Sequence, residues 1–348
     1  MPIFCYKNSA VQRDMEIFDA DVFNVYKNAR VLITGVTGML ATYIAYAMMY
    51  LNDTKSLNIS VVGLARNRKK AEERFFDLVE RPDFSLLIQD VTQPVTDEEG
   101  FDYIFHLAGS ASAAAIVSSP QGIIAANVAG TGNILELAAA KPGTKVFFAS
   151  TREVYGKTDS TVIKEDDIGI LNPLSVRSCY PESKRMAENL CAVYNDKYGV
   201  NVAIGRIAHS YGPGMQLEGD GRIMADLISN AVKGEDITLK SDGSAKRAFC
   251  YISDAVAAVL MAAGRVSGLE VYNIANEKEE ISIKDLAAMI AGMVPGVKVA
   301  FTLPDESAKK AYFNIERVSL STEKIEKLGW KPVTGLEEGI KRTIEVMI

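Results

Sequence analysis

The chain has 348 residues, 48% of them hydrophobic, which is enough to build one large domain or two. Its formal net charge of -6 argues against a general nucleic-acid binder, which would need concentrated basic charge, so we expect no nucleic-acid partner. The four cysteines are scattered without metal-ligand spacing. This cysteine usage predicts a reducing, cytoplasmic location and no metal site.

Residues 1–28 precede the first expected strand and carry an irregular apolar stripe without a basic start or a continuous apolar run. They are therefore not a secretion signal, and we expect an extension packed on the domain surface or at a subunit contact. Residues 38–52 are apolar but shorter than the roughly 20 residues of a membrane helix. We expect a buried helix there and no membrane partner.

The first motif is a short apolar strand at residues 31–33 that runs into a glycine turn and then a helix. Gly35 permits a tight turn, Gly38 lets the backbone approach a pyrophosphate, and Ala41 lets the helix lie close to the strand. An ordinary strand–turn–helix also shows short glycine patterns by chance, but this one predicts a dinucleotide-binding unit. Its candidate cofactor contacts are Gly35, Thr37, Gly38, Met39 and Leu40.

The second expected strand, residues 59–65, ends where such a fold selects between NAD and NADP. A carboxylate there binds the ribose 2′-hydroxyl of NAD, whereas an arginine accommodates the 2′-phosphate of NADP. The chain has Arg66 and Arg68 and no carboxylate, which favours NADP locally. Arg66 stacking on the adenine, or simply leading into the next helix, is the alternative.

Further strands alternate with helices along the first two thirds of the chain. This alternation predicts an α/β fold built on a Rossmann doubly wound parallel sheet, with strands at 84–87, 103–107, 145–149 and 201–207 and a long helix at 122–140. The carboxyl ends of the strands should line the cofactor crevice. They add five candidate cofactor contacts: Asp90, Val91, Leu107, Ala108 and Gly109.

The last third of the chain predicts a smaller C-terminal α/β substrate domain. Its expected elements are helices at 223–232, 281–293, 322–328 and 336–347 and short strands at 237–239 and 297–301. We expect residues 29–208 to form the NAD(P)-binding domain, with return segments at about 253–276. Residues 209–252 and 277–348 would then form the substrate domain.

Tyr180 and Lys184 lie four residues apart at an expected helix start, so they share one helical face. The lysine ammonium can lower the phenol pKa and also reach a nicotinamide ribose, while Thr151 at a strand end can share the same proton. A tyrosine–lysine pair at this spacing occurs by chance in many helices. Together with the glycine turn, however, it predicts removal of a hydroxyl proton while hydride leaves the same carbon.

In these motifs the chain resembles the extended short-chain dehydrogenases/reductases that modify nucleotide sugars. The resemblance covers about residues 29–345, and the segments at 176–185, 211–213, 220–222, 247–254 and 330–339 look most like UDP-glucuronate decarboxylases. It implies transient oxidation of the sugar at C4 by bound NAD(P), a step on the activated ketone, and return of the hydride. It also implies a homodimer through the helices at 122–140 and 184–198.

Arg152 departs from this family. It stands where the 4,6-dehydratases have an Asp that protonates the departing hydroxyl, and where the decarboxylases usually have a Ser. An arginine cannot be that acid, which disfavours dehydration. It can bind a sugar carboxylate through a two-pronged contact or pair with Glu153, which matches the family's glutamate and can act as a base or position a water.

Three other residues are candidate substrate contacts. His209 replaces an Asn that contacts the nucleotide diphosphate in relatives, and a hydrogen-bonded loop histidine is the alternative. Arg222 and Arg247 are expected to clamp the diphosphate, with a surface salt bridge as the alternative for each.

The resemblance implies NAD, because these decarboxylases carry the acidic residue of an NAD site, whereas Arg66 suggests NADP. The predicted function is a nucleotide-sugar epimerase or decarboxylase acting on a nucleotide-diphosphate sugar. An NADPH-dependent nucleotide-sugar reductase is the alternative, followed by a non-catalytic cofactor-binding regulator.

Overall fold

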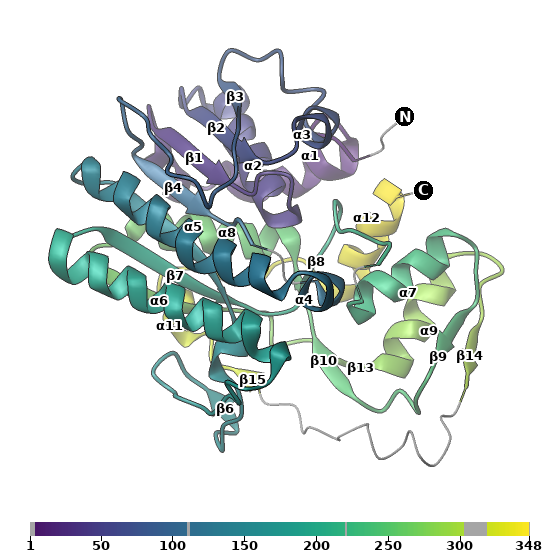
Figure 1. The fold of residues 1–348 in the computed structure, drawn as a ribbon. Helices are drawn as coiled ribbons and strands as arrows, with labels where there is room; N and C mark the ends of the chain where they lie inside the picture. The colour runs from purple at the N-terminus through teal and green to yellow at the C-terminus, as the bar shows by residue number, and fades with distance from the viewer. Residues whose placement is uncertain (1–3, 110–111, 220, 303–318, 348) are drawn as a thin grey trace.

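The computed structural model describes residues 4–109, 112–219, 221–302 and 319–347. A seven-stranded parallel sheet forms its centre, in the order β12-β7-β5-β4-β1-β2-β3 (Figure 1). Its strands are β1 (Arg30–Thr34), β2 (Ser60–Ala65), β3 (Phe84–Ile88), β4 (Tyr103–His106), β5 (Lys145–Thr151), β7 (Asn201–Ile207) and β12 (Leu269–Ile274). The reversal of strand order next to β1 confirms the predicted doubly wound sheet.

Helices cover both faces of the sheet. One face packs against α2 (Met39–Lys55) and α8 (Ile252–Arg265), and the other against α5 (Pro120–Ala140) and α6 (Cys179–Tyr198) (Figure 1). Strand β1 shows why the sequences of these strands are continuous runs of apolar residues. Val31 and Ile33 belong to the first core and Leu32 to the second, so both faces of the strand are buried.

The N-terminal segment is built more deeply into the fold than a surface extension. It forms α1 (Ser9–Met15) and two short 3₁₀ helices, η1 (Glu16–Asp19) and η2 (Asp21–Tyr26). Phe18, Phe23 and Tyr26 are buried in the core that α2 and α8 share, and the Tyr26 hydroxyl donates to the Leu260 carbonyl at 2.6 Å. Because these side chains fill the larger core, the segment stabilises the Rossmann sheet itself.

Outside the large sheet the chain builds small two-stranded sheets and short helices. The pairs are β8 (Ser210–Tyr211) with β11 (Cys250–Tyr251), β9 (Ile237–Leu239) with β14 (Val299–Phe301), β10 (Lys246–Ala248) with β13 (Glu280–Ser282), and β6 (Val162–Ile163) with β15 (Ser319–Leu320). The helices include α7 (Ile223–Val232), α9 (Ile283–Met293), α11 (Glu323–Glu326) and α12 (Leu336–Met347). Helix α9 begins two residues after the expected 281, because residues 281 and 282 pair with β10 instead.

The chain leaves the large sheet after β7 and returns to it as β12, which pairs with β7 in parallel. The division into a Rossmann and a substrate domain at the residues given above stays a prediction. One described helix, α5, is long and apolar enough to cross a membrane by length and composition alone. It lies alongside α6 over the sheet (Figure 1), the position of a helix that covers a core.

Candidate active site

The glycine turn between β1 and α2 presents backbone amides to the carboxyl edge of the sheet. Gly35 has φ +65°, and a Cβ there would start 2.9 Å from the Ala108 Cα, so only glycine fits. Gly38 caps α2, and within the described part of the chain no side-chain hydrogen bond caps this end of the helix. Because α2 is 17 residues long and has no acidic residue in its first turn, its N-terminus is suited to an anion.

Leu107, Ala108 and Gly109 follow β4, and the backbone of Leu107 and Ala108 lies against the glycine turn. A side chain at Gly109 would start 2.6 Å from Asn127 Oδ1 and 3.7 Å from Lys184 Nζ, so the glycine lets both side chains approach its backbone closely. Asn127 Oδ1 is buried and has no hydrogen-bond partner among the described residues. A buried polar atom without a partner, beside a lysine and a glycine backbone, is consistent with a bound polar ligand. The residues therefore fit a dinucleotide.

Arg66 and Asp90 lie at the neighbouring strand ends. Their side chains pair at 3.6 Å, and the Arg66 side chain is 77% exposed. The Thr92 amide, and to a smaller extent Arg66, hold the pKa of Asp90 below its ordinary value. Arg66 is thus an exposed side chain at the predicted ribose position that already neutralises a nearby carboxylate.

The end of β5 and the start of α6 bring Thr151, Tyr180 and Lys184 together, as their motifs predict. All three are buried, and Thr151 hydrogen-bonds the Tyr180 hydroxyl. The Lys184 ammonium donates to the Ala149 carbonyl at 2.6 Å and lies 4.6 Å from the centre of the Phe148 ring. The sequence motif of a tyrosine and a lysine on one face therefore becomes a buried cluster against the strand end.

The electrostatics of Tyr180 differ from the prediction that Lys184 lowers its pKa. Burial dominates and raises the pKa of Tyr180 to about 12, while the hydrogen bond from Thr151 opposes this rise. Burial also lowers the pKa of Lys184 to about 8. In the chain alone, burial thus dominates the pKa of both groups, and the phenol keeps its proton at neutral pH.

Glu153 takes a partner that was not predicted. Its carboxylate pairs with Arg177, at 2.8 Å, and not with Arg152. Its negative charge raises the pKa of Tyr180, and the positive charges of Arg177 and Arg222 lower it. Arg177 and Arg222 therefore lie within electrostatic reach of the tyrosine hydroxyl.

Arg152 instead contacts His209. Its Nη1 lies 3.1 Å from His209 Nε2, and because arginine only donates, this ring nitrogen is the acceptor of the contact. His209 has φ +46°, a left-handed conformation that a non-glycine residue rarely adopts. Such strain is often found at functional sites. The structure thus joins two of the residues that depart from the family pattern.

The two expected diphosphate clamps differ in their placement. Arg222 is the N-cap residue of α7, whereas Arg247 lies on β10 and donates to the carbonyl of Lys246 at 2.7 Å. No contact among the described residues brings Arg247 to the tyrosine. Asp220, part of the segment with Arg222, lies outside the described residues.

Comparison with known proteins agrees with this geometry. The model of the NAD dependent epimerase/dehydratase family matches residues 31–275. UDP-glucuronic acid decarboxylase 6 of Arabidopsis thaliana is 33% identical over 320 residues, covering 90% of this chain and 87% of that protein. UDP-glucuronic acid decarboxylase 1 of Danio rerio is also 33% identical and covers 91% of this chain and 72% of its own length. The chain belongs to the NAD-dependent epimerase/dehydratase family.

Solved structures of other proteins have the same fold as this chain. UDP-glucuronic acid 4-epimerase from Bacillus cereus, in complex with UDP-glucuronic acid and NAD, superposes with a TM-score of 0.76 at 22% identity, covering 91% of this chain and 98% of its own. UDP-N-acetylglucosamine 4-epimerase from Methanobrevibacter ruminantium M1 has a TM-score of 0.76 at 21% identity, with 91% and 97% covered. The prediction of family and fold is confirmed.

The structure adds to this family site a buried polar network that the sequence analysis did not identify. Thr34 Oγ1 accepts from the amides of Leu107 and Ala108, so its own hydrogen must go to His106 Nδ1, at 2.8 Å. The neutral ring therefore carries its hydrogen on Nε2 and donates to Thr131, at 3.1 Å. The Thr131 hydroxyl in turn donates to the Asn127 carbonyl.

The same network continues to the catalytic helix. Asn127 Nδ2 donates to Ser183 Oγ at 2.9 Å, and Ser183 donates to the Tyr180 carbonyl at 2.9 Å. The glycine turn and the catalytic tyrosine are thus joined by hydrogen bonds through α5. Asn127 and Thr131 are polar side chains four residues apart in an apolar helix, and this spacing was a usable signal because buried polar groups require partners.

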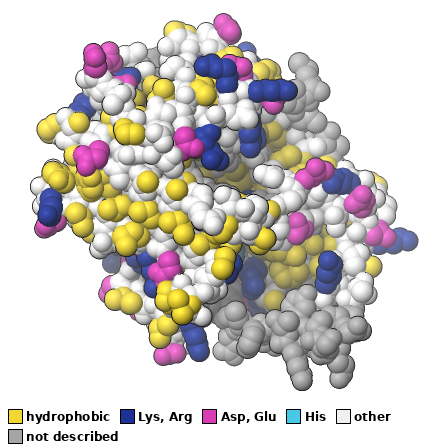
Figure 2. All heavy atoms as spheres, in the orientation of Figure 1, with side chains coloured by type: hydrophobic (Ala, Val, Ile, Leu, Met, Phe, Trp, Pro, Cys, Tyr) yellow, Lys and Arg dark blue, Asp and Glu magenta, His cyan; other side chains and the backbone are white. Residues whose placement is uncertain are grey.

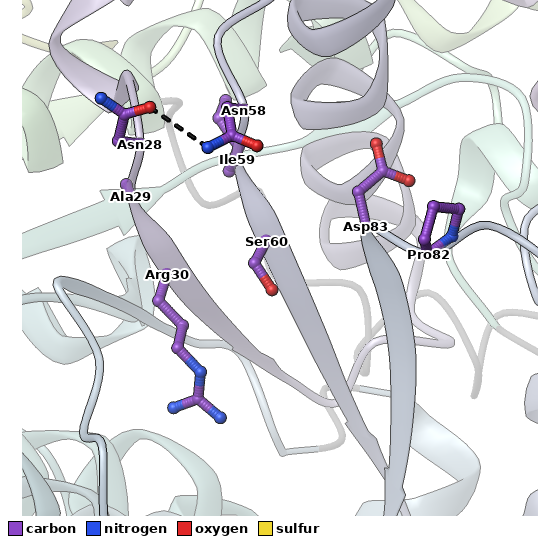
Figure 3. Close-up of a pocket in the computed structure, with 8 residues that line it drawn as sticks. All are labelled: Asn28, Ala29, Arg30, Asn58, Ile59, Ser60, Pro82 and Asp83. Carbon is purple, nitrogen blue, oxygen red and sulfur yellow. Dashed lines mark hydrogen bonds between the residues drawn. The ribbon is translucent and has the colours of Figure 1, made fainter.

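A separate pocket of about 320 Å³ lies at the amino ends of β1, β2 and β3, the sheet edge away from the glycine turn (Figure 3). Its charged side chains are engaged within the chain, since Arg30 binds Asp97 and Asp83 binds Arg81. It lies at the wrong edge for the cofactor, which binds outside the carboxyl ends of such strands. Among the described residues, no cluster of three or more His, Cys, Asp or Glu side chains could hold a metal.

Proposed function

We propose that this chain is a nucleotide-sugar epimerase or decarboxylase that uses bound NAD and oxidises the sugar transiently at C4. The observation that carries the proposal is the buried cluster of Thr151, Tyr180 and Lys184 beside the glycine turn. Its relatives, named as UDP-glucuronic acid decarboxylases, and its structural neighbours, named as 4-epimerases, support a nucleotide-diphosphate sugar as the substrate.

Each residue of the cluster has a distinct task in this reaction. NAD, when bound, accepts a hydride from C4 and returns it. Tyr180 takes up the proton of the C4 hydroxyl, and Thr151 hydrogen-bonds the same phenol. Because burial raises the pKa of Tyr180 to about 12, the phenol must first lose its own proton to act as this base. Positive charge nearby favours the ionised phenol, and that is the task we propose for the Lys184 ammonium.

The charged side chains around the tyrosine suit an acidic sugar. Arg152 lies next to Thr151 in sequence and presents its guanidinium to His209, so a carboxylate can replace the imidazole as its partner. Glu153, held by Arg177, is the candidate general base or the residue that positions a water. Arg152 cannot protonate a departing hydroxyl, which keeps dehydration disfavoured.

Arg66 supports one alternative, an NADPH-dependent reductase, because its exposed guanidinium lies at the strand end that reads the ribose. We favour NAD, since the ion pair with Asp90 already neutralises this arginine in part. Mass spectrometry of the dinucleotide released by denaturing the purified protein distinguishes the two cofactors. NADP in the released fraction would contradict the assignment of NAD.

Turnover of UDP-glucuronate and UDP-glucose, without added reductant, tests the reaction. We expect conversion with no net consumption of cofactor, and the mass of the product separates decarboxylation, which loses CO₂, from epimerisation, which leaves the mass unchanged. Turnover that requires stoichiometric NADPH would instead support the reductase. Full biological activity of a Tyr180→Phe protein would support a non-catalytic regulator.

We also propose a cytoplasmic homodimer. Four cysteines remain free thiols, which fits a reducing compartment. Hydrophobic side chains gather over α5 and α6 (Figure 2), and the exposed ones include Ile124, Met186, Val193 and Tyr198. Sedimentation should show a dimer that Met186→Glu weakens, because a charge in an apolar interface is costly. A monomer at every concentration would contradict the proposal.

A further inference from the structure

Glu188 lies one helical turn beyond Lys184, on the same face of α6, and its side chain is only 12% exposed. Its carboxylate accepts hydrogen bonds from side chains on two strands. Ser150 Oγ donates to it at 2.5 Å, and Arg206 donates through Nε at 3.1 Å and Nη2 at 2.7 Å. The carboxylate is therefore the meeting point of α6, β5 and β7.

The strand register explains how one carboxylate reaches both partners. Ser150 of β5 is paired with Arg206 of β7, and register partners on parallel strands point to the same face of the sheet. Arg206 is itself held in place, since it donates to the Glu165 carbonyl at 2.7 Å and lies 4.7 Å from the centre of the Tyr155 ring. Glu188 thus binds a prearranged pair.

Three consecutive residues of β5 each contact a different residue of α6. The Ala149 carbonyl accepts from Lys184, the Ser150 hydroxyl donates to Glu188, and the Thr151 hydroxyl bonds Tyr180. The middle contact ends in an ion pair, and such charge-assisted bonds are the stronger class. Loss of this contact would leave the strand end free to move relative to the helix.

The titratable groups that face Lys184 come from two elements. Helix α6 contributes Glu188 and Cys191, with Tyr180 one turn before the lysine, and β4 contributes His106. Burial keeps Cys191 and Tyr180 protonated and His106 neutral, because it raises the first two pKa values and lowers the third. Glu188 is therefore the charged neighbour of the lysine within this set, and its negative charge raises the pKa of Lys184 against the effect of burial.

We propose that Glu188 is a positioning residue that fixes the end of β5, and hence Thr151, against the helix that carries Tyr180 and Lys184, and that it keeps the lysine charged. The proposal rests on the catalytic roles proposed above for Tyr180 and Lys184. It assigns two separable functions to one carboxylate, a geometric one through Ser150 and an electrostatic one toward Lys184.

The electrostatic function is tested by following the Cε chemical shift of Lys184 with pH in protein labelled with ¹³C-lysine, with Lys184→Arg for assignment. Glu188→Gln removes the negative charge, so we expect the titration midpoint to fall by about one pH unit. Arg206→Gln removes the compensating positive charge, so the midpoint should rise. Opposite shifts are not expected from general loosening of the structure.

The geometric function is tested by kinetics with UDP-glucuronate. Ser150→Ala retains every charge, so we expect kcat to fall about tenfold, from the loss of one hydrogen bond to a charged group, while KM changes less than about threefold. The Lys184 midpoint should not move in this variant. Asp196→Asn, an exposed carboxylate on the same helix, is the matched control and should alter neither readout.

A Lys184 midpoint that is the same in Glu188→Gln and Asp196→Asn would overturn the electrostatic function. An unchanged kcat in Ser150→Ala would overturn the geometric one. If Glu188→Gln does not fold, Glu188→Asp replaces it, and it should keep the midpoint within about 0.3 pH units of the wild type while lowering kcat. Failure of the proposed function is distinguishable, because full turnover by Tyr180→Phe would remove the catalytic role without affecting the NMR result.

Discussion

On the cofactor side of the site the chain presents backbone amides and small polar side chains, whereas on the substrate side it presents charged side chains from separate segments. A network of hydrogen bonds that runs from Thr34 through His106 to Ser183 supports the glycine turn and the segment that ends at Gly109. Across the catalytic tyrosine, Arg152 meets His209, and Glu153 meets Arg177. The first region is suited to hold one ligand in one pose, and the second can change partners when a substrate arrives.

The boundary between the two regions is Tyr180, and its removal should have the largest effect. Tyr180→Phe keeps the ring packing but deletes the hydroxyl that moves the proton. We expect kcat to fall by about 10³-fold, within the usual range for an acid–base group, with the bound dinucleotide retained. Steady-state kinetics and the absorbance of the released cofactor measure the two outcomes. A loss of the bound cofactor together with activity would show that Tyr180 supports the cofactor site and does not act only in proton transfer.

On the cofactor side, we expect a disturbed backbone at the glycine turn to weaken NAD binding. Gly35→Ala forces a side chain into a left-handed position 2.9 Å from the Ala108 backbone, so we expect affinity for NAD to fall about 100-fold. Calorimetric titration with NAD measures the change. Gly199→Ala is the matched control, since Gly199 has a similar φ of +68° but nothing within 4 Å of the added Cβ. Equal losses in both variants would show that strain alone, and not the turn, weakens binding.

On the substrate side, we expect a substitution to lower turnover of one sugar and not of the other. Arg152→Ser removes a charged donor, so kcat/KM for UDP-glucuronate should fall about 30-fold, the equivalent of about 2 kcal/mol for a charge-assisted bond. UDP-glucose has no carboxylate and serves as the internal control. Arg13→Ser, on α1, is the matched control variant, since this arginine is exposed and pairs with Glu345. Parallel losses with both sugars would show that Arg152 supports the site and does not recognise a carboxylate.

The smallest expected effect concerns stability and the buried His106. Burial lowers the pKa of His106 to about 3, from about 6.5 in an unfolded chain. As the pH falls below about 6.5, the unfolded chain takes up a proton that the folded chain excludes, so stability is lost at up to about 1.4 kcal/mol per pH unit. This loss should continue until the pH approaches the folded pKa.

His106→Asn keeps an acceptor for Thr34 but does not titrate. The difference in unfolding free energy between the wild type and this variant should therefore shrink by about 1.4 kcal/mol between pH 7.5 and pH 5.5. Urea unfolding at both pH values measures it. A difference that stays constant would mean that the imidazole is not held neutral, and that the cofactor-side network is less rigid than its hydrogen bonds indicate.

Much of the cofactor side was predictable because its determinants are local. The spacing of Gly35 and Gly38, the alternation of apolar strands with helices, and the four-residue spacing of Tyr180 and Lys184 each depend on neighbours in sequence. A regular period therefore placed these residues correctly at the carboxyl edge of the sheet. It also supported the resemblance that the family comparison confirms.

The partners of charged groups were not predictable in this way. The pairing of Arg152 with Glu153 was one expected alternative, yet Glu153 pairs with Arg177 and Arg152 contacts His209, 57 residues away. The direction of the Tyr180 pKa shift was also predicted wrongly, because the motif does not reveal burial, which is the largest cause of that shift. Ion pairs and desolvation depend on distances across the fold and on the depth of each group below the surface.

The order of the residues was enough to predict the doubly wound sheet, the glycine turn and the tyrosine–lysine face, because hydrophobic period and turn chemistry act over a few residues. The folded chain was needed to find that the N-terminal segment fills the core and that Glu188 binds Ser150 and Arg206. These contacts join residues that are far apart in the chain, at spacings that follow no helical or strand period. Their partners are selected by strand register and by the need of every buried charge for a counter-charge.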